Sequence, residues 1–252
     1  MLNTIKLYTA NGLNERGIIT ADQSQELTEL LRDNRYDTQW VSTGTPSQIS
    51  PISILFEFRD RYGDEVNVDI VNIILQNINI KRAYFTADLG DGETIIALLS
   101  NNTLSNVVMS MYTGTFVIPW IKMYITDLFP LETLAKIGQI RFVKPITFTD
   151  CFLTAKNIKR ATSENLNRTR DGSLVFSRDY WKFKCDLDVS NLVYADNMIL
   201  RQQILGSENF TISLWDNYSL LDVYGVYAKP SYSEEISGET ELAAISIPLE
   251  GL

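Results

Sequence analysis

Residues 31–44 read LRDNRYDTQWVSTG and bring two arginines, two aspartates and a tryptophan into one short stretch. Such a set of side chains serves catalysis, ligand binding or the closure of a fold. Catalysis is the least expected use, because the chain of 252 residues contains no histidine, the usual base that activates a nucleophile. The sequence around this stretch helps to decide between ligand binding and closure of the fold.

Hydrophobic and polar residues alternate in several runs after this stretch. In the first run the apolar positions are Ile52, Ile54, Phe56 and Phe58, and residues 66–70 and 210–214 follow the same period of two. This period is typical of a strand that buries one face. Turn residues separate the runs, and the clearest helical stretch is short, beginning after Asp22 or Ser24. We therefore predict an all-β protein with antiparallel sheets, of the sandwich or jelly-roll type.

Segments between residues 20 and 143 resemble, in their order, the discoidin or coagulation-factor C-type domain. Asp33 to Ser42 resembles the family element D-G-N-x-x-T-x-W-x-S, although Asn34 and Arg35 depart from it. The later segments are ISILFEF (52–58), DIVNIILQNINIK (69–81), the turn Asp91-Gly92, IKMYI (121–125) and IGQIRF (137–142). The resemblance implies a discoidin-like jelly-roll β-sandwich.

In such a fold the opening stretch is expected to act as a structural closure. A sandwich must tie its first strand to the far side, and a buried indole such as Trp40 removes on the order of 200 Å² from water while its N–H bonds a backbone acceptor. Asp33 and Thr38 are expected to hydrogen-bond the loop to itself, as short polar side chains do in turns. The predicted structural residues are thus Asp33, Thr38 and Trp40.

Some relatives with this fold hold a calcium ion at the equivalent loop, with a glutamate of the closing strand as a further ligand. Here Gln139 stands at that position and carries no charge. Calcium prefers several oxygen ligands that include carboxylates. We expect plain loop structure and no cofactor, with calcium bound by Asp33 and Asp37 as the alternative.

A change in composition after Pro145 predicts a domain boundary. The sequence downstream is richer in Asn, Arg, Asp and Tyr. We place a discoidin-like sandwich with an N-terminal arm in residues 1–145 and a β-rich attachment domain in residues 146–252. The strand pattern of the second part is similar to that of attachment domains in bacteriophage tail and baseplate proteins. Residues 1–8 and the acidic segment 231–242 are the expected arms.

The charge of the chain narrows the classes of partner. A net charge of -9 and a pI near 4.6 repel phosphate backbones, so no nucleic acid is expected, and the basic residues between Lys156 and Arg170 are interpreted as a solvated face.

The two cysteines lack metal-ligand spacing, and the N-terminus lacks the pattern of a signal peptide. Residues 107–129 carry few charges, but alternation around 121–125 predicts strands rather than membrane insertion.

These features favour a non-enzymatic structural component of a phage tail tip or baseplate. Such a protein would be assembled in the bacterial cytoplasm into a virion. It would contact other tail or baseplate proteins through strand edges and arms, and form a homo-oligomeric ring. Paired acids such as Asp60 and Asp64 fit exposed turns better than a glycosidase cleft.

The alternative is a glycan-binding, lectin-like module that recognises a cell surface. Exposed aromatic residues on loops at one end of a jelly roll stack on sugar rings, and relatives of this fold bind glycans or lipid headgroups there. The candidate glycan-binding residues are Tyr36, Tyr62 and Tyr112. Substitution of Tyr36 would abolish binding under this alternative.

Overall fold

The computed structural model describes residues 3–8, 13, 17–33, 38–60, 62–90, 92–111, 116–168, 174–206, 210–213, 223–228, 233–237 and 242–251. The chain divides into two compact units. Residues Tyr8–Pro145 form one, here called the sandwich unit, and Met1–Leu7 with Ile146–Leu252 form the other, here called the ribbon unit. Both consist mainly of antiparallel strands, which confirms the predicted all-β class.

One layer of the sandwich unit is a five-stranded sheet. In the order of pairing its strands are β2 (Ile18–Ala21), β4 (Ile52–Glu57), β11 (Trp120–Leu128), β7 (Ile80–Asp88) and β8 (Glu93–Leu99). Buried and half-buried residues alternate along β4 and along residues 120–125 of β11, as the sequence predicts. The sheet therefore has an inner face in the core and an outer face.

The other layer contains shorter strands. Its three-stranded sheet is ordered β13 (Gln139–Val143), β6 (Asn72–Gln76) and β9 (Val107–Ser110). Two small pairs complete the unit, β10 (Phe116–Ile118) with β5 (Val68–Ile70), and β12 (Lys136–Ile137) with β3 (Trp40–Val41). The described residues between 107 and 129 thus include the strands β9, β10 and β11. No helix in the described part of the chain is long and apolar enough to cross a membrane.

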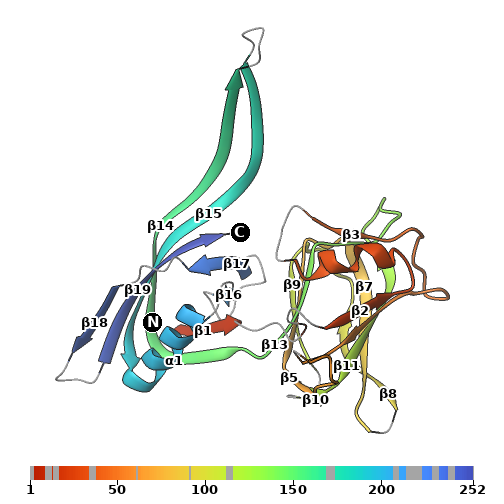
Figure 1. The fold of residues 1–252 in the computed structure, drawn as a ribbon, viewed down its shortest axis with the longest axis horizontal. Helices are drawn as coiled ribbons and strands as arrows, with labels where there is room; N and C mark the ends of the chain where they lie inside the picture. Colours follow the sequence, from red (N-terminus) through yellow and green to blue (C-terminus); the bar gives the residue numbers. More distant parts are fainter. Residues whose placement is uncertain are drawn as a thin grey trace. The chain divides into compact units, whose positions relative to one another are not determined.

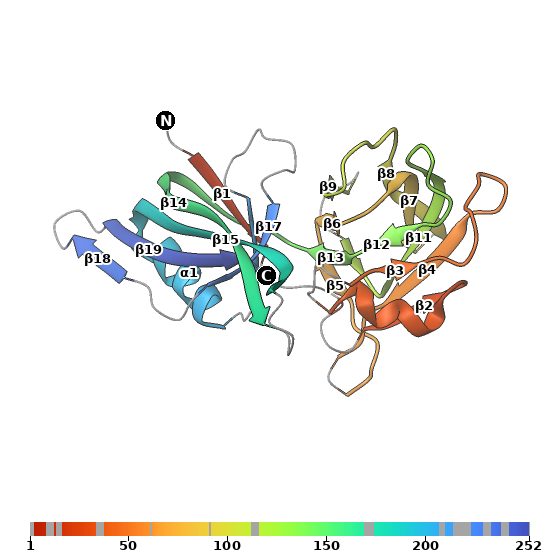
Figure 2. The ribbon, with the colours of Figure 1, turned by 90° about the horizontal axis from the view of Figure 1, so that it is seen from above.

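The strands of the sandwich unit are seen in Figure 1 and Figure 2. Aromatic contacts join its two layers. The ring of Phe142 in β13 lies edge-on to Phe56 of β4, with centroids 5.0 Å apart, and to Phe58, at 5.6 Å. All three side chains are fully or almost fully buried. Edge-to-face pairs contribute about 0.5–1.5 kcal/mol beyond the area they bury, so this cluster holds the layers together.

The predicted first helix is present, but as the 3₁₀ helix η2 (Gln25–Leu31) without the expected cap. Ser24 precedes it in the left-handed region, with φ of 49°, and makes no side-chain capping bond. The Asp22 carboxylate instead accepts the backbone N–H of Ser53 at 2.9 Å. The prediction of a cap by Asp22 or Ser24 is wrong because Asp22 binds the start of β4.

The ribbon unit is built on a seven-stranded sheet, ordered β15-β14-β1-β16-β17-β19-β18, in which β15 also pairs with β19. The strands are β1 (Asn3–Tyr8), β14 (Ile146–Arg168), β15 (Leu174–Val193), β16 (Phe210–Ser213), β17 (Val223–Ala228), β18 (Ser233–Ser237) and β19 (Leu242–Gly251). Leu7 of β1 lies opposite Ile146 of β14. The expected N-terminal arm is therefore a strand of the ribbon unit.

One α-helix, α1 (Tyr194–Gly206), follows β15 directly and packs near β15 and β19. The sequence analysis does not predict it. Its apolar residues Met198, Ile199 and Leu200 are consecutive rather than spaced for one helical face. Leu200 and Asn197 are nevertheless buried, so packing against the sheet supports this helix.

Candidate functional site

The outer face of the five-stranded sheet carries a compact group of polar and aromatic side chains. In β11, Ile121, Met123 and Ile125 are fully buried, whereas Lys122 and Tyr124 are half-buried on the other face. The register places Tyr124 opposite Tyr84 of β7, and Lys122 opposite Thr86. With Glu93 from β8, the residues Tyr84, Thr86, Lys122 and Tyr124 form what is here called the tyrosine cluster.

Two tyrosine rings form the centre of this cluster. The rings of Tyr84 and Tyr124 are stacked, with centroids 4.8 Å apart and planes inclined by 18°. The ammonium nitrogen of Lys122 lies 4.8 Å from the centroid of the Tyr124 ring, within the range of a cation–π interaction. A stacked aromatic pair and a positive charge therefore adjoin each other on the outer face of the sheet.

Glu93 adds a carboxylate whose position is fixed. The Thr86 hydroxyl donates to Glu93 Oε1 at 2.6 Å, and the Tyr124 hydroxyl donates to the same oxygen at 2.8 Å. Within the described part of the chain, Oε2 makes no hydrogen bond. One oxygen of Glu93 thus anchors the side chain and the other is open to a ligand.

The cluster also sets the protonation of its members. Hydrogen bonds from Thr86 and Tyr124 hold the pKa of Glu93 below its usual value, against a smaller opposing effect of burial. Burial raises the pKa of Tyr124. The hydrogen bond with Tyr124 raises the pKa of Lys122, with partial burial opposing it. At neutral pH the face therefore presents a carboxylate, a neutral phenol and an ammonium group.

Apolar side chains border the cluster on β8. Leu98 lies opposite Tyr84 in the register and is 51% exposed, and Ile95 lies opposite Thr86 with the same exposure. Exposed aliphatic residues beside half-buried rings extend the apolar surface across two strands. A ligand that fits this face needs both an apolar side and polar groups.

Of the glycan-binding residues predicted from sequence, the structure describes Tyr62, which lies outside this cluster. Tyr62 is 73% exposed and lies in a turn after β4, where the Asp60 carboxylate accepts the backbone N–H groups of Tyr62 at 2.7 Å and Asp64 at 3.0 Å. Tyr36 and Tyr112 lie outside the described residues. Asp60 and Asp64 thus shape an exposed turn.

The residues predicted to close the fold are found together near η2. The Thr38 hydroxyl donates to Asp33 Oδ2 at 2.6 Å. Trp40 is fully buried, and its indole N–H donates to the backbone oxygen of Ser24 at 3.2 Å. Trp40 also lies opposite Ile137, so β3 and β12 join the N-terminal loop to the last strands of the sandwich unit.

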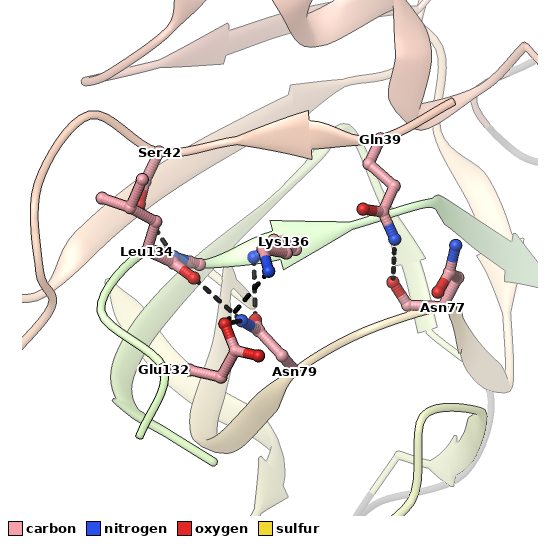
Figure 3. A network of polar contacts seen from close by, with 8 residues as sticks. Gln39, Ser42, Asn77, Asn79, Glu132, Leu134 and Lys136 are labelled. Atoms are coloured by element: carbon pink, nitrogen blue, oxygen red, sulfur yellow. Dashed lines mark hydrogen bonds and ion pairs between the residues drawn. The ribbon is translucent and has the colours of Figure 1, made fainter. Parts of the chain in front are cut away.

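A polar network holds the same loops (Figure 3). The Asn79 amide donates to Glu132 Oε2 at 3.1 Å and to the backbone oxygen of Leu134 at 2.8 Å, and its oxygen accepts the Lys136 N–H at 2.8 Å. Beside it, the Ser42 hydroxyl accepts the N–H of Ala135 at 2.9 Å. These bonds connect the loop after β11 to the strands around it, so the polar groups serve the structure.

The calcium alternative gains no support from the described residues, among which no three acidic or cysteine side chains group closely enough to hold a metal ion. Asp33 accepts the Thr38 hydroxyl, and Gln139 is buried in β13. Asp37 is outside the described residues. Calcium binding by Asp33 and Asp37 stays a prediction.

The sequence held one signal for the tyrosine cluster. In residues 120–125 the apolar residues alternate with Lys122 and Tyr124, which places these two on the outer face. Tyr84 and Glu93 come from other strands, and only the strand order and register bring them to Tyr124.

No protein-family model and no curated protein matches the chain. Solved structures do match. A family 32 carbohydrate-binding module from Clostridium perfringens in complex with galactose is 15% identical, covering 56% of this chain and 99% of that one, with a TM-score of 0.40. A second module from Clostridium perfringens, in complex with GalNAc-β-1,3-galactose, is 12% identical over 54% and 100%, with a TM-score of 0.42. A chitosan-binding module from Paenibacillus is 12% identical over 54% and 100%, with a TM-score of 0.41.

These matches correct one prediction. The predicted role as a structural component of a phage tail tip or baseplate is not retained, since the solved structures that the chain matches are carbohydrate-binding modules. The expected tail and baseplate partners are not retained either. The glycan-binding alternative is the reading that these matches favour.

Proposed function

We propose that this protein binds carbohydrate without transforming it, and that the tyrosine cluster is its binding surface. The stacked pair of Tyr84 and Tyr124 beside the fixed carboxylate of Glu93 is the observation that carries the proposal. Its partner would be a glycan, such as one on a cell surface.

The aromatic part of the cluster suits the apolar face of a sugar ring. The C–H groups of a pyranose pack against the flat surface of a tyrosine, which is large, rigid and loses little conformational freedom on binding. Leu98 and Ile95, each 51% exposed, extend this surface towards the edge of the sheet. A sugar ring lying across β7 and β8 would contact Tyr84 and Leu98, which are directly opposite each other.

The charged part of the cluster suits the hydroxyl groups of the same sugar. Glu93 Oε2 would accept hydrogen bonds from them, and the ammonium of Lys122 would donate. Glu93 is already held by Thr86 and Tyr124, so binding does not need to order its side chain. The cluster contributes one carboxylate, whereas most glycosidases use two across a cleft, so we propose binding and not hydrolysis.

A glycan array followed by calorimetric titration of the best ligand tests the proposal. Tyr124→Ala and Tyr84→Ala are each expected to weaken binding about tenfold or more, which corresponds to about 1.4 kcal/mol. Tyr62→Ala is the matched control, since Tyr62 is exposed in a separate turn, and it is expected to leave binding unchanged. Circular dichroism verifies that each variant is folded.

The opposite pattern of effects on glycan binding would contradict the tyrosine cluster as the binding site. If Tyr62→Ala abolishes binding and Tyr124→Ala does not, the ligand is bound by loops and not by the tyrosine cluster. If no glycan binds the wild-type chain, the proposed function fails.

A further inference from the structure

The two longest strands of the ribbon unit extend beyond the neighbours that support them (Figure 1). β14 and β15 pair from Phe152 with Ser190 to Arg168 with Leu174. β1 pairs with β14 only over Ile146–Cys151, and β19 pairs with β15 only over Lys184–Val193. Residues 159–168 and 174–183, here called the distal ribbon, are therefore two-stranded within the described part of the chain.

A two-stranded ribbon is a weak structure by itself. An isolated hairpin is marginally stable in water, and both of its edges present unpaired backbone N–H and C=O groups. In the supported part of the same strands, by contrast, Val189 and Phe148 are almost fully buried. The distal ribbon is therefore expected to gain stability from a partner.

The distal ribbon and its surroundings differ sharply in charge from the rest of the chain. Residues 156–184 contain eight lysines and arginines and three acidic residues, a net charge of +5. The whole chain carries -9, which leaves -14 for the remaining residues. An arm and a body of opposite charge attract each other between copies of the same protein.

The register at the base of the distal ribbon brings basic and aromatic residues together. Ala161 lies opposite Lys182, Arg160 opposite Phe183 and Thr162 opposite Trp181. Lys159 lies opposite Lys184, which on its other side lies opposite Glu250 of β19. The paired segments thus contain lysine, arginine and aromatic residues. A partner is expected to supply negative charge and apolar surface.

The ribbon unit itself contains a complementary edge. Among the described strands, β18 is the last of the sheet and pairs on one side only, with β19. It carries Glu234 and Glu235, and residues 231–242 contain four glutamates and no basic residue. An open strand edge can accept a further strand through backbone hydrogen bonds.

We propose that the distal ribbon of one copy docks along β18 of a second copy. Backbone bonds would add an edge of the ribbon to the open edge of β18, and the net positive charge of residues 156–184 would complement the glutamates of that strand. The contact joins two different surfaces, so it closes as a reciprocal dimer or as a ring. Nucleic acid is a less suitable occupant, because the net -14 of the remaining chain repels a phosphate backbone.

This assembly goes beyond carbohydrate binding and does not depend on it. An oligomer would present several copies of the sandwich unit, and linked weak sites bind a multivalent surface far more tightly than single sites do. The tyrosine cluster can fail as a glycan site while the ribbon contact holds, and the reverse is equally measurable.

Charge-reversed variants of the full chain, followed by light scattering after size exclusion, test the contact. Lys182→Glu with Lys184→Glu reverses the charge at these two positions and lowers the net charge of residues 156–184 from +5 to +1. Glu234→Lys with Glu235→Lys reverses the charge of β18. In each double variant alone, the affinity of self-association is expected to fall about tenfold or more, so that the monomer predominates. An equimolar mixture of the two variants is expected to assemble again. The glutamates introduced at 182 and 184 in one variant then meet the lysines introduced at 234 and 235 in the other. Lys182→Arg with Lys184→Arg keeps the charge and is the matched control, expected to assemble like the wild type.

Three results would overturn the proposal. They are a wild-type chain that stays monomeric at all concentrations, reversed variants that assemble unchanged, or a mixture that stays monomeric. Binding of the wild-type chain to heparin, lost in the ribbon variant and without any oligomer, would assign the ribbon to a polyanion and also overturn it.

Discussion

The indole N–H of Trp40 donates to the backbone oxygen of Ser24, 3.2 Å away, while the whole indole is buried. Ser24 has a positive φ and directly precedes η2, so this bond links the start of that helix to β3. Because β3 pairs with β12, Trp40 joins segments almost 100 residues apart in the chain. The indole is the point at which the N-terminal loop is attached to the sandwich unit.

Trp40→Ala is expected to destabilise the sandwich unit by about 3–5 kcal/mol, because it leaves a large cavity in a packed core. Scanning calorimetry of the full chain measures the effect as a lower unfolding temperature of that unit. Ile49→Ala is the control, since Ile49 is almost completely exposed, and its effect is expected to stay within about 0.5 kcal/mol. Equal effects of both substitutions would show that the indole does not anchor the loop.

Asn79→Ala is expected to destabilise the sandwich unit by about 2–3 kcal/mol. It removes the amide that binds Glu132, Leu134 and Lys136, and leaves partly buried backbone groups without partners. Gln39→Ala removes one long bond of 3.4 Å to the backbone oxygen of Asn77 and is expected to cost much less. Urea denaturation of both variants compares them, and a similar loss in each would contradict the central role of Asn79.

Leu131→Gly is expected to stabilise the protein by about 0.5–1 kcal/mol. Leu131 adopts a φ of 72°, a region that favours glycine, and its side chain is fully exposed, so nothing buried is lost. Leu131→Ala is the control and is expected to be neutral, because alanine retains the Cβ that strains this conformation. Thermal unfolding distinguishes the two variants. A lower unfolding temperature of the glycine variant than of the wild type would contradict the backbone strain at Leu131.

Thr86→Val is expected to raise the pKa of Glu93 towards its usual value, because the Thr86 hydroxyl is the main cause of its lowering. A lowered carboxyl pKa stabilises the folded state above the unfolded value, and this contribution is lost as the pH falls through the folded value. The wild type is therefore expected to keep Glu93 ionised to a lower pH than the variant. Carbon-detected NMR titration of the Glu93 carboxyl group measures its pKa in the wild type and in the variant.

Thr94→Val is the control for that titration. Its hydroxyl donates to the backbone oxygen of Gly92 and makes no bond to Glu93. An unchanged pKa of Glu93 in the Thr86 variant would show that the carboxylate of the tyrosine cluster is not held as described.

Local pattern was sufficient to predict several strands of the sandwich unit. The alternation in residues 52–58 and 121–125 follows directly from the geometry of a strand with one buried face. The aromatic residues Phe56 and Phe58 were expected in the core for the same reason, and they are buried there. These properties depend on neighbours in sequence, which a single chain reveals.

Register and strand order were not predictable in this way. Tyr84 meets Tyr124 because β7 and β11 pair in one particular register, and a shift by one residue would turn either ring into the core. Glu93 reaches Tyr124 from a third strand. The missed helix α1 has no regular apolar stripe, and its stability depends on contacts with the sheet.

Leu7 lies directly opposite Ile146 in the ribbon unit, and these two residues flank the sandwich unit. The whole sandwich unit is thus a cassette spliced between two paired strands, with its entry and exit side by side. A short turn in place of residues 8–145 would leave an ordinary hairpin, and a different cassette with adjacent ends would fit the same junction. The sandwich unit can therefore be exchanged as a single piece without a change in the strand order of the ribbon unit.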